Sequence, residues 1–231
     1  VGDLSYLARA GDGPVIVFLH GIGSNASSFG PLFEALPDGP ALLAWNAPGY
    51  GASVPLAEPW PLAGDYADRL AGFLDTLGHA SVHLVGHSLG TLIAACFARR
   101  FPDRVQSLTL AAAANGYGVP RGGTMPDGVA ARLTDLARLG PADFARARAA
   151  NLVHDPERNA GVVAQVEAAM AQIRPDGYGQ AVRMLASGDL PAELAHVTVR
   201  PGFIIGRQDR VTPMAQTIAA ADAWAAAHGP R

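Results

Sequence analysis

Ser88 is the residue whose setting most directly suggests covalent chemistry. It lies in GHSLG at positions 86–90, directly after the apolar run SVHLV and directly before TLIAACFA. The G-x-S-x-G pattern is informative only when it follows a strand and opens a helix, and both conditions are met here. Such a turn exposes the hydroxyl at the carboxyl edge of a sheet, beside a helix N-terminus that favours negative charge. Ser88 is therefore a candidate nucleophile; the alternative is an ordinary helix N-cap.

A serine that attacks a carbonyl needs two backbone N–H donors for the negative charge that develops on the carbonyl oxygen. The first would come from Leu89, the residue after the candidate nucleophile. The second would come from the turn HGIGSN at 20–25, where we expect the amide of Ile22 to donate, with Gly23 as the next choice. We expect His20 to have a structural role beneath this turn rather than to act as a base.

Alternating apolar runs and amphipathic stretches predict the elements that position these residues. Strands are expected at 14–21, 41–51, 81–86, 105–114 and 199–213. Helices are expected at 62–78, 88–102 and 214–229. Strands that alternate with helices predict an α/β fold with a doubly wound, mostly parallel sheet.

The alternation breaks between residues 115 and 190. This stretch has amphipathic helical patterns but no evident strand, and it is too long for a plain connection. We interpret it as a helical lid inserted into a core made of 1–114 and 191–231. Its eight acidic and eight basic residues are evenly mixed, which is typical of solvated helix faces. Its exposed apolar residues fit either a lid surface or the interface of a homodimer.

Composition narrows the range of partners. The net charge is −3 and the basic residues, all arginine, form no long cluster, which argues against nucleic acid and membrane surfaces. No apolar run reaches the roughly 20 residues of a membrane span, and no signal peptide is evident, so we expect a cytoplasmic protein with a small-molecule substrate. Cys96 is the single cysteine and is expected to be buried. No His, Cys and Asp cluster has metal-ligand spacing, and neither a metal nor a cofactor is expected.

Four motifs follow one another along the chain: HGIG at 20–23, NAPGYGAS at 46–53, GHSLG at 86–90 and GRQDRVTP at 206–213. In this order and spacing they resemble the α/β-hydrolase fold superfamily, and the chain is similar to small bacterial esterases, enol-lactonases and carbon–carbon bond hydrolases. The resemblance implies a Ser, Asp, His triad in that chain order. Ser88 matches the nucleophile and Asp209 matches the acid, although Asp209 could instead be a turn residue that caps the next helix. Asn46 stands where the family more usually has Asp.

The histidine of the triad has no clear counterpart. In the family it usually follows the acid by about 25–30 residues, which corresponds to 235–240, whereas the sequence ends at Arg231. His228 is the remaining candidate, but a polar residue in the last turn of a helix needs no further role. The histidines at 79, 83, 87, 154 and 196 are placed less favourably, and His87 is expected to point away from the pocket. Because the sequence also begins at Val1 rather than Met, we expect a chain that is truncated at both ends.

Three functions fit this pattern. The first is a serine hydrolase that acts on small esters or lactones through a Ser-His-Asp triad and an acyl-enzyme. The second is a carbon–carbon bond hydrolase of the same fold, in which Arg146, Arg148 or Arg183 would face the pocket and bind a substrate carboxylate. The third is a non-catalytic binding protein in which the histidine is truly absent. An arginine that faces the pocket would distinguish the second function from the first, and a histidine that reaches Ser88 would exclude the third.

Overall fold

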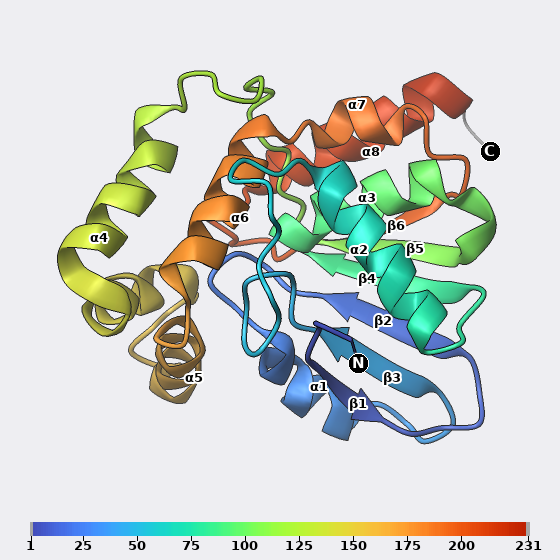
Figure 1. Cartoon of the computed structure of the whole chain (residues 1–231), viewed down its shortest axis with the longest axis horizontal. Coiled ribbons are helices and arrows are strands. Elements are labelled where there is room, and N and C mark those ends of the chain that lie inside the picture. The colour runs from blue at the N-terminus through green and yellow to red at the C-terminus, as the bar shows by residue number, and fades with distance from the viewer. Residues whose placement is uncertain (1, 230–231) are drawn as a thin grey trace.

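A computed structural model describes residues 2–229 (Figure 1). Its centre is a six-stranded sheet with the order β1-β3-β2-β4-β5-β6, in which β1 is antiparallel to β3 and all other neighbours are parallel. The strands are β1 (Tyr6–Arg9), β2 (Val15–Leu19), β3 (Ala41–Trp45), β4 (Val82–His87), β5 (Val105–Ala111) and β6 (Pro201–Ile204). The mostly parallel sheet predicted from the sequence is thus confirmed.

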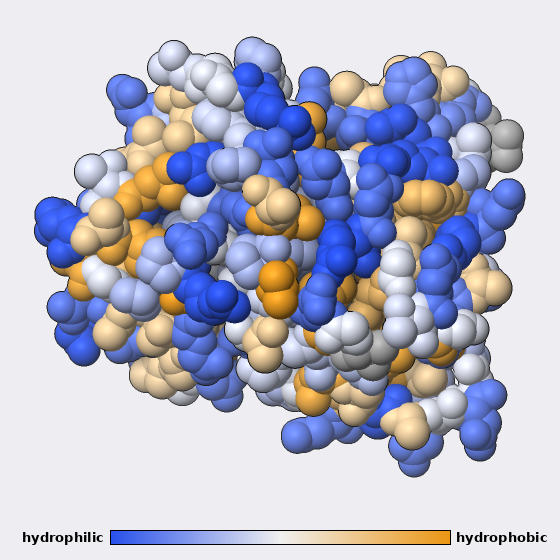
Figure 2. Space-filling model, viewed as in Figure 1, coloured by the Kyte–Doolittle hydropathy of each residue, from blue (hydrophilic) through white to orange (hydrophobic). Residues whose placement is uncertain are grey.

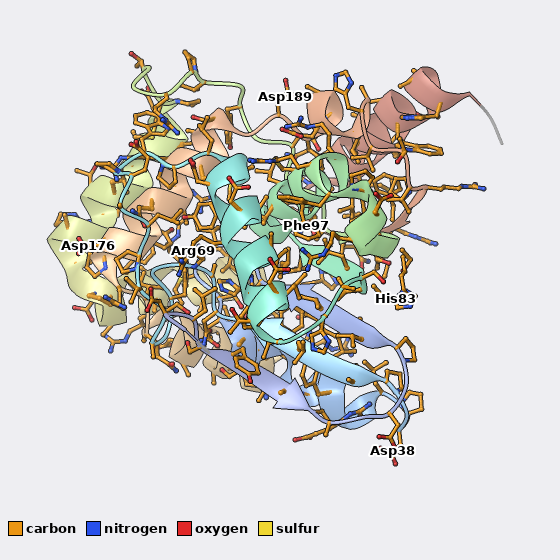
Figure 3. All side chains as sticks on the ribbon, turned by 45° about the vertical axis from the view of Figure 1, so that its right-hand side comes forward. Asp38, Arg69, His83, Phe97, Asp176 and Asp189 are labelled. Carbon is orange, nitrogen blue, oxygen red and sulfur yellow. The ribbon has the colours of Figure 1, made fainter. Side chains whose placement is uncertain are left out.

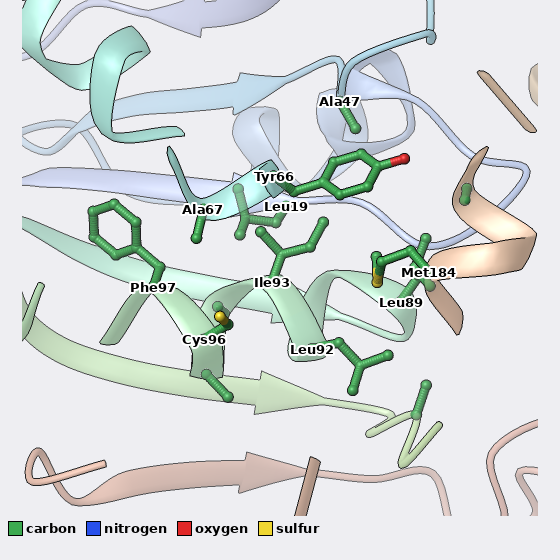
Figure 4. Close-up of a cluster of buried hydrophobic side chains, with 14 of the residues drawn as sticks. Leu19, Ala47, Tyr66, Ala67, Leu89, Leu92, Ile93, Cys96, Phe97 and Met184 are labelled. Carbon is green, nitrogen blue, oxygen red and sulfur yellow. The ribbon is translucent and has the colours of Figure 1, made fainter. Parts of the chain in front are cut away.

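Both faces of the sheet are buried, which explains why its strands are apolar at successive positions. In β2, Val17 and Leu19 contribute to the core on one face, while Phe18 packs on the opposite face. Helices α2 (Ala63–Thr76) and α3 (Leu89–Arg100) cover the first face, and α1 (Gly30–Ala35) covers the second with Phe33. The residues Leu89–Ala98 of α3 are all buried, and in Figure 4 the helix lies against the strands with Ile93 and Phe97 in the core.

Three long helices come between β5 and β6 in the chain. They are α4 (Asp127–Arg148), α5 (Ala160–Met170) and α6 (Pro175–Ser187). In Figure 1, α4 and α5 stand away from the sheet, and α6 lies between them and the core. Asp176 and Asp189, labelled in Figure 3, lie in the first turn of α6 and at the N-cap of the short helix that follows it. Helix α4 is kinked at Gly140, which has φ 71° and precedes Pro141.

The backbone of helix α6 contacts the backbone of the turn after β3 directly, through a glycine on each side. A Cβ atom on Gly177 would lie 2.1 Å from the carbonyl oxygen of Gly49, and a Cβ atom on Gly49 would lie 2.4 Å from the Cα atom of Gly177. Only glycine fits on either side of this contact. The contact fixes α6 against the turn that follows β3.

Two late helices complete the fold: α7 (Leu190–Leu194) and α8 (Met214–His228). Strand β6 forms one edge of the sheet and leaves Ile204 61% exposed. On the face shown in Figure 2, hydrophilic residues predominate and hydrophobic residues form small separate patches. No helix within residues 2–229 is long and apolar enough to cross a membrane.

The strands that flank the candidate site are shorter than predicted. Strand β5 ends at Ala111 because Ala112 has φ 50°, and β6 ends at Ile204, so that 205–213 forms a loop. Strand β1 was not predicted, since four residues at a sheet edge carry too short a pattern to recognise.

Candidate active site

Ser88 forms the sharp turn between β4 and α3. Its φ and ψ angles of 51° and −117° lie in a region that residues other than glycine rarely adopt. Hydrogen bonds hold this conformation: the Ser88 amide donates to the Ala111 carbonyl at 2.9 Å, and the Ser88 carbonyl accepts from the Thr91 amide and hydroxyl at 2.9 and 2.6 Å. The Ser88 hydroxyl caps no helical amide, so the N-cap interpretation finds no support.

The glycines of GHSLG allow this turn to sit tightly against its neighbours. A Cβ atom on Gly86 would lie 2.5 Å from the Gly90 carbonyl oxygen, and one on Gly90 would lie 2.3 Å from the Leu19 carbonyl oxygen. A side chain at either position would therefore push α3 away from β2 and β4. The pattern that identified Ser88 in the sequence is a packing requirement of the structure.

The turn after β2 lies directly beside the serine. A Cβ atom on Gly21 would lie 3.0 Å from the Ser88 Cβ and 3.5 Å from its Oγ. The amides of Ile22 and Leu89, both residues of the cavity wall, have no hydrogen-bond acceptor within residues 2–229. The Gly23 amide, the alternative donor, is oriented toward the Tyr50 hydroxyl at 3.4 Å. Two unpaired donors thus flank Ser88, as an oxyanion site requires.

His20 holds this turn from below. The ring is 3% exposed; its Nδ1 lies 2.8 Å from the Gly21 carbonyl oxygen, and its Nε2 accepts the Ala47 amide at 3.1 Å. Burial lowers the pKa of His20 from 6.5 to about 4, with a smaller lowering from His87 and an opposing effect of the Gly21 hydrogen bond. Because both nitrogens are engaged, His20 has the structural role expected from the sequence.

Asp209 lies in the loop after β6 and lines the same cavity as Ser88. Its Oδ1 accepts the amides of Val211 and Thr212 at 2.8 and 2.9 Å, and its Oδ2 accepts the Thr212 hydroxyl at 2.9 Å. A carboxylate offers about four acceptor positions, so Oδ2 keeps one for a further donor. The loop therefore fixes the carboxylate at the cavity wall without using all of its capacity.

These residues surround one cavity of about 1180 Å³. It opens at the carboxyl ends of β2 and β4, where the chain leaves one strand toward α1 and the other toward α3. Ligands bind at such switch points in open parallel sheets. Residues of α4, α5 and α6 form the opposite wall. Ser88, Asp209, Ile22 and Leu89, which the sequence singled out separately, are brought together here.

The histidines that line the cavity are not the ones expected from the sequence. His228 is stacked on the Trp224 ring, 4.8 Å between centroids, and its Nδ1 lies 2.9 Å from the Trp224 carbonyl oxygen, so it has no place in the cavity wall. The prediction that His87 points away from the pocket is wrong: within residues 2–229, His87 and His154 line the cavity. The last paired residues of β2 and β4 are Leu19 and Gly86. Beyond them Gly21 lies beside the His87 ring, where a Cβ atom would be 3.2 Å from Nδ1.

Of the three arginines predicted to bind a substrate carboxylate, the structure places only one in the cavity wall. Arg148 lines the cavity, but Arg146 is 2.6 Å from Asp143 and Arg183 donates to the Pro59 carbonyl at 3.4 Å, and neither forms part of the wall. Arg132 of α4 lines the cavity and was missed, because no local signal shows which side of a helix faces a pocket.

Comparison with known proteins agrees with this geometry. A family model described as alpha/beta hydrolase fold matches residues 14–228. The chain belongs to the alpha/beta hydrolase fold family. Among solved structures, this hydrolase-fold chain is similar to the enol-lactonase from Burkholderia xenovorans LB400, with a TM-score of 0.83, 24% identity, and coverage of 95% of this chain and 84% of the other.

Two relatives show how far the sequence likeness extends. A 2-(acetamidomethylene)succinate hydrolase of Mesorhizobium japonicum is 41% identical over 98 residues, 42% of this chain and 35% of its own length. A pimeloyl-(acyl-carrier protein) methyl ester esterase of Neisseria meningitidis is 28% identical over 210 residues, 86% of this chain and 76% of its own. The hydrolase-fold chain matches 28–36% of the length of the first three curated relatives.

Proposed function

We propose that the protein is a serine hydrolase of small carboxylic esters or lactones. The observation that carries this proposal is the strained Ser88 turn at a cavity wall with two unpaired amides beside it. Strain of this kind costs about 1–3 kcal/mol, and here the surrounding hydrogen bonds maintain it. Relatives named as a methyl ester esterase and a 2-(acetamidomethylene)succinate hydrolase support a proposal of hydrolysis.

In the proposed reaction the Ser88 Oγ attacks the substrate carbonyl and a histidine takes its proton. The amides of Ile22 and Leu89 bind the oxyanion, the C–O bond to the alcohol breaks, and the histidine returns the proton to the leaving oxygen. A water molecule then gives a proton to the histidine and attacks the acyl carbon. The bond to the Ser88 Oγ breaks, Oγ takes the proton back, and the acid is released. Asp209 would orient the histidine through the free acceptor position of Oδ2, and α4–α6 would act as a lid over the substrate.

The identity of the base is the point that needs an experiment. His87 is one candidate, because it lines the cavity next to Ser88; desolvation lowers its pKa, against the opposing effect of Asp209. Its Nδ1 and the Ser88 Oγ both lie beside Gly21. A His87→Gln variant tests this assignment directly.

The test is labelling with a fluorophosphonate probe, followed by location of the adduct by mass spectrometry. We expect an adduct on Ser88 that is lost in Ser88→Ala and kept in Ser28→Ala, a matched control because Ser28 also lines the cavity. Loss of the adduct in His87→Gln would assign the base to His87. A folded protein without any Ser88 adduct would refute the hydrolase proposal and favour a binding protein.

A further inference from the structure

The cavity wall carries more positive than negative charge. Four arginines line it, Arg132, Arg148, Arg207 and Arg210, against two acidic residues, Asp155 and Asp209. The Asp209 carboxylate is bound by its own loop, and the Asp155 carboxylate lies 3.8 Å from Arg158, which is outside the wall. Neither acid is therefore paired with an arginine of the cavity.

The arginines of helix α4 differ in whether they form ion pairs with acidic residues. Its outer arginines Arg138 and Arg146 pair with the aspartates three residues before them, at 3.2 and 2.6 Å. The two that face the cavity, Arg132 and Arg148, have no acidic partner within residues 2–229. Arg148 lies over the Phe144 ring, 5.1 Å from its centroid.

Arg132 is the more unusual of the two. Its Nε is fully buried and has no hydrogen-bond acceptor within the described chain, although the residue is only partly buried as a whole. A buried donor without an acceptor destabilises the folded state, and an arginine cannot avoid this by losing its proton. The arrangement is explained if the acceptor arrives with the ligand.

We propose that Arg132, together with Arg148, binds a carboxylate on the substrate at the end remote from the scissile bond. The guanidinium group presents parallel N–H donors that match the two oxygens of a carboxylate. The preferred substrates are then half-esters of dicarboxylic acids, or lactones that carry a free carboxylate. This inference rests on the proposed hydrolase function and adds the class of substrate.

Binding of glutarate, a small dicarboxylate, tests the site without any need for catalysis. We expect calorimetry to show binding to the wild type and to Ser88→Ala, and a roughly 10- to 100-fold weaker affinity in Arg132→Gln. Arg138→Gln is the matched control, since this arginine is on the same helix but faces outward, and it should leave the affinity unchanged. Equal affinity in Arg132→Gln, or no binding to the wild type, would overturn the proposal.

Kinetics with a charged and a neutral substrate tests the same residue in turnover. Wild type should hydrolyse monomethyl glutarate with a kcat/KM at least about 10-fold above that for dimethyl glutarate. Arg132→Gln should lose most of this preference, because its kcat/KM should fall much more for the monomethyl ester than for the dimethyl ester. If glutarate binds but the fluorophosphonate probe does not label Ser88, the hydrolase function is refuted and the carboxylate site is not.

Thermal unfolding separates a binding role from a structural one. Because Arg132→Gln removes a buried donor that has no acceptor, its Tm should equal or exceed that of the wild type. A lower Tm together with unchanged glutarate affinity would show that Arg132 supports the fold and would overturn the binding role.

Discussion

Acid is expected to destabilise the protein through His20. The ring is 3% exposed and neutral in the fold, and its Nε2 already accepts the Ala47 amide. A second proton on Nε2 would oppose that N–H group and would place a charge in the core. Burial accordingly lowers the pKa of His20 from 6.5 to about 4.

The sign of the effect follows from proton uptake by the unfolded chain. Between pH 6.5 and about 4 the unfolded state binds a proton at His20 and the folded state does not, so the free energy of unfolding falls as the pH falls. At 1.36 kcal/mol per pKa unit, the full loss is about 3 kcal/mol. Most of it, about 2.5 kcal/mol, is reached by pH 4.5.

Urea unfolding of the wild type and of His20→Gln at pH 7.5 and pH 4.5 measures this loss. Glutamine keeps polar atoms at the site but does not titrate, so the wild type should lose about 2.5 kcal/mol more than the variant between the two values. His228→Gln serves as the control, because His228 lies at the end of α8, outside the core. Equal losses in wild type and His20→Gln would show that the ring is not held neutral and would refute the argument.

Three further predictions concern packing. Gly90→Ala should lower the free energy of unfolding by about 1–3 kcal/mol, because the new Cβ atom would meet the Leu19 carbonyl, whereas Gly72→Ala, on the open side of α2, should raise it by about 0.5–1 kcal/mol in the same urea titration. Gly177→Ala should displace α6, seen as a raised KM for the half-ester and as faster amide hydrogen exchange in that helix. The Cys96 thiol, whose pKa burial raises to about 11, should react with Ellman's reagent only in denaturant, and reaction in the native protein would contradict its burial.

The features that the sequence predicted correctly are those that depend on local backbone requirements. The strain at Ser88 and the close contacts of Gly86 and Gly90 demand particular residue types at fixed spacing, and such a pattern is readable without a structure. The parallel strands were equally readable, since burial on both faces requires continuous apolar runs.

The features that were missed depend on how distant segments pack. Arg132 and Arg138 have similar neighbours in the sequence, but α4 turns only the first toward the cavity. The direction of His87 depends on Gly21, which belongs to another strand connection and leaves space beside the ring. No single window of sequence contains either relation.

The contact between Gly49 and Gly177 divides the cavity wall into a part that resists mutation and a part that tolerates it. Helix α6 is held at Gly177, where no side chain can be added, while α4 and α5 lie further from the sheet and carry arginines or apolar residues that line the cavity. Selection for a new substrate would therefore act most freely on α4 and α5. A directed-evolution library confined to the cavity-facing positions of these two helices would vary specificity while preserving the fold and the Ser88 turn.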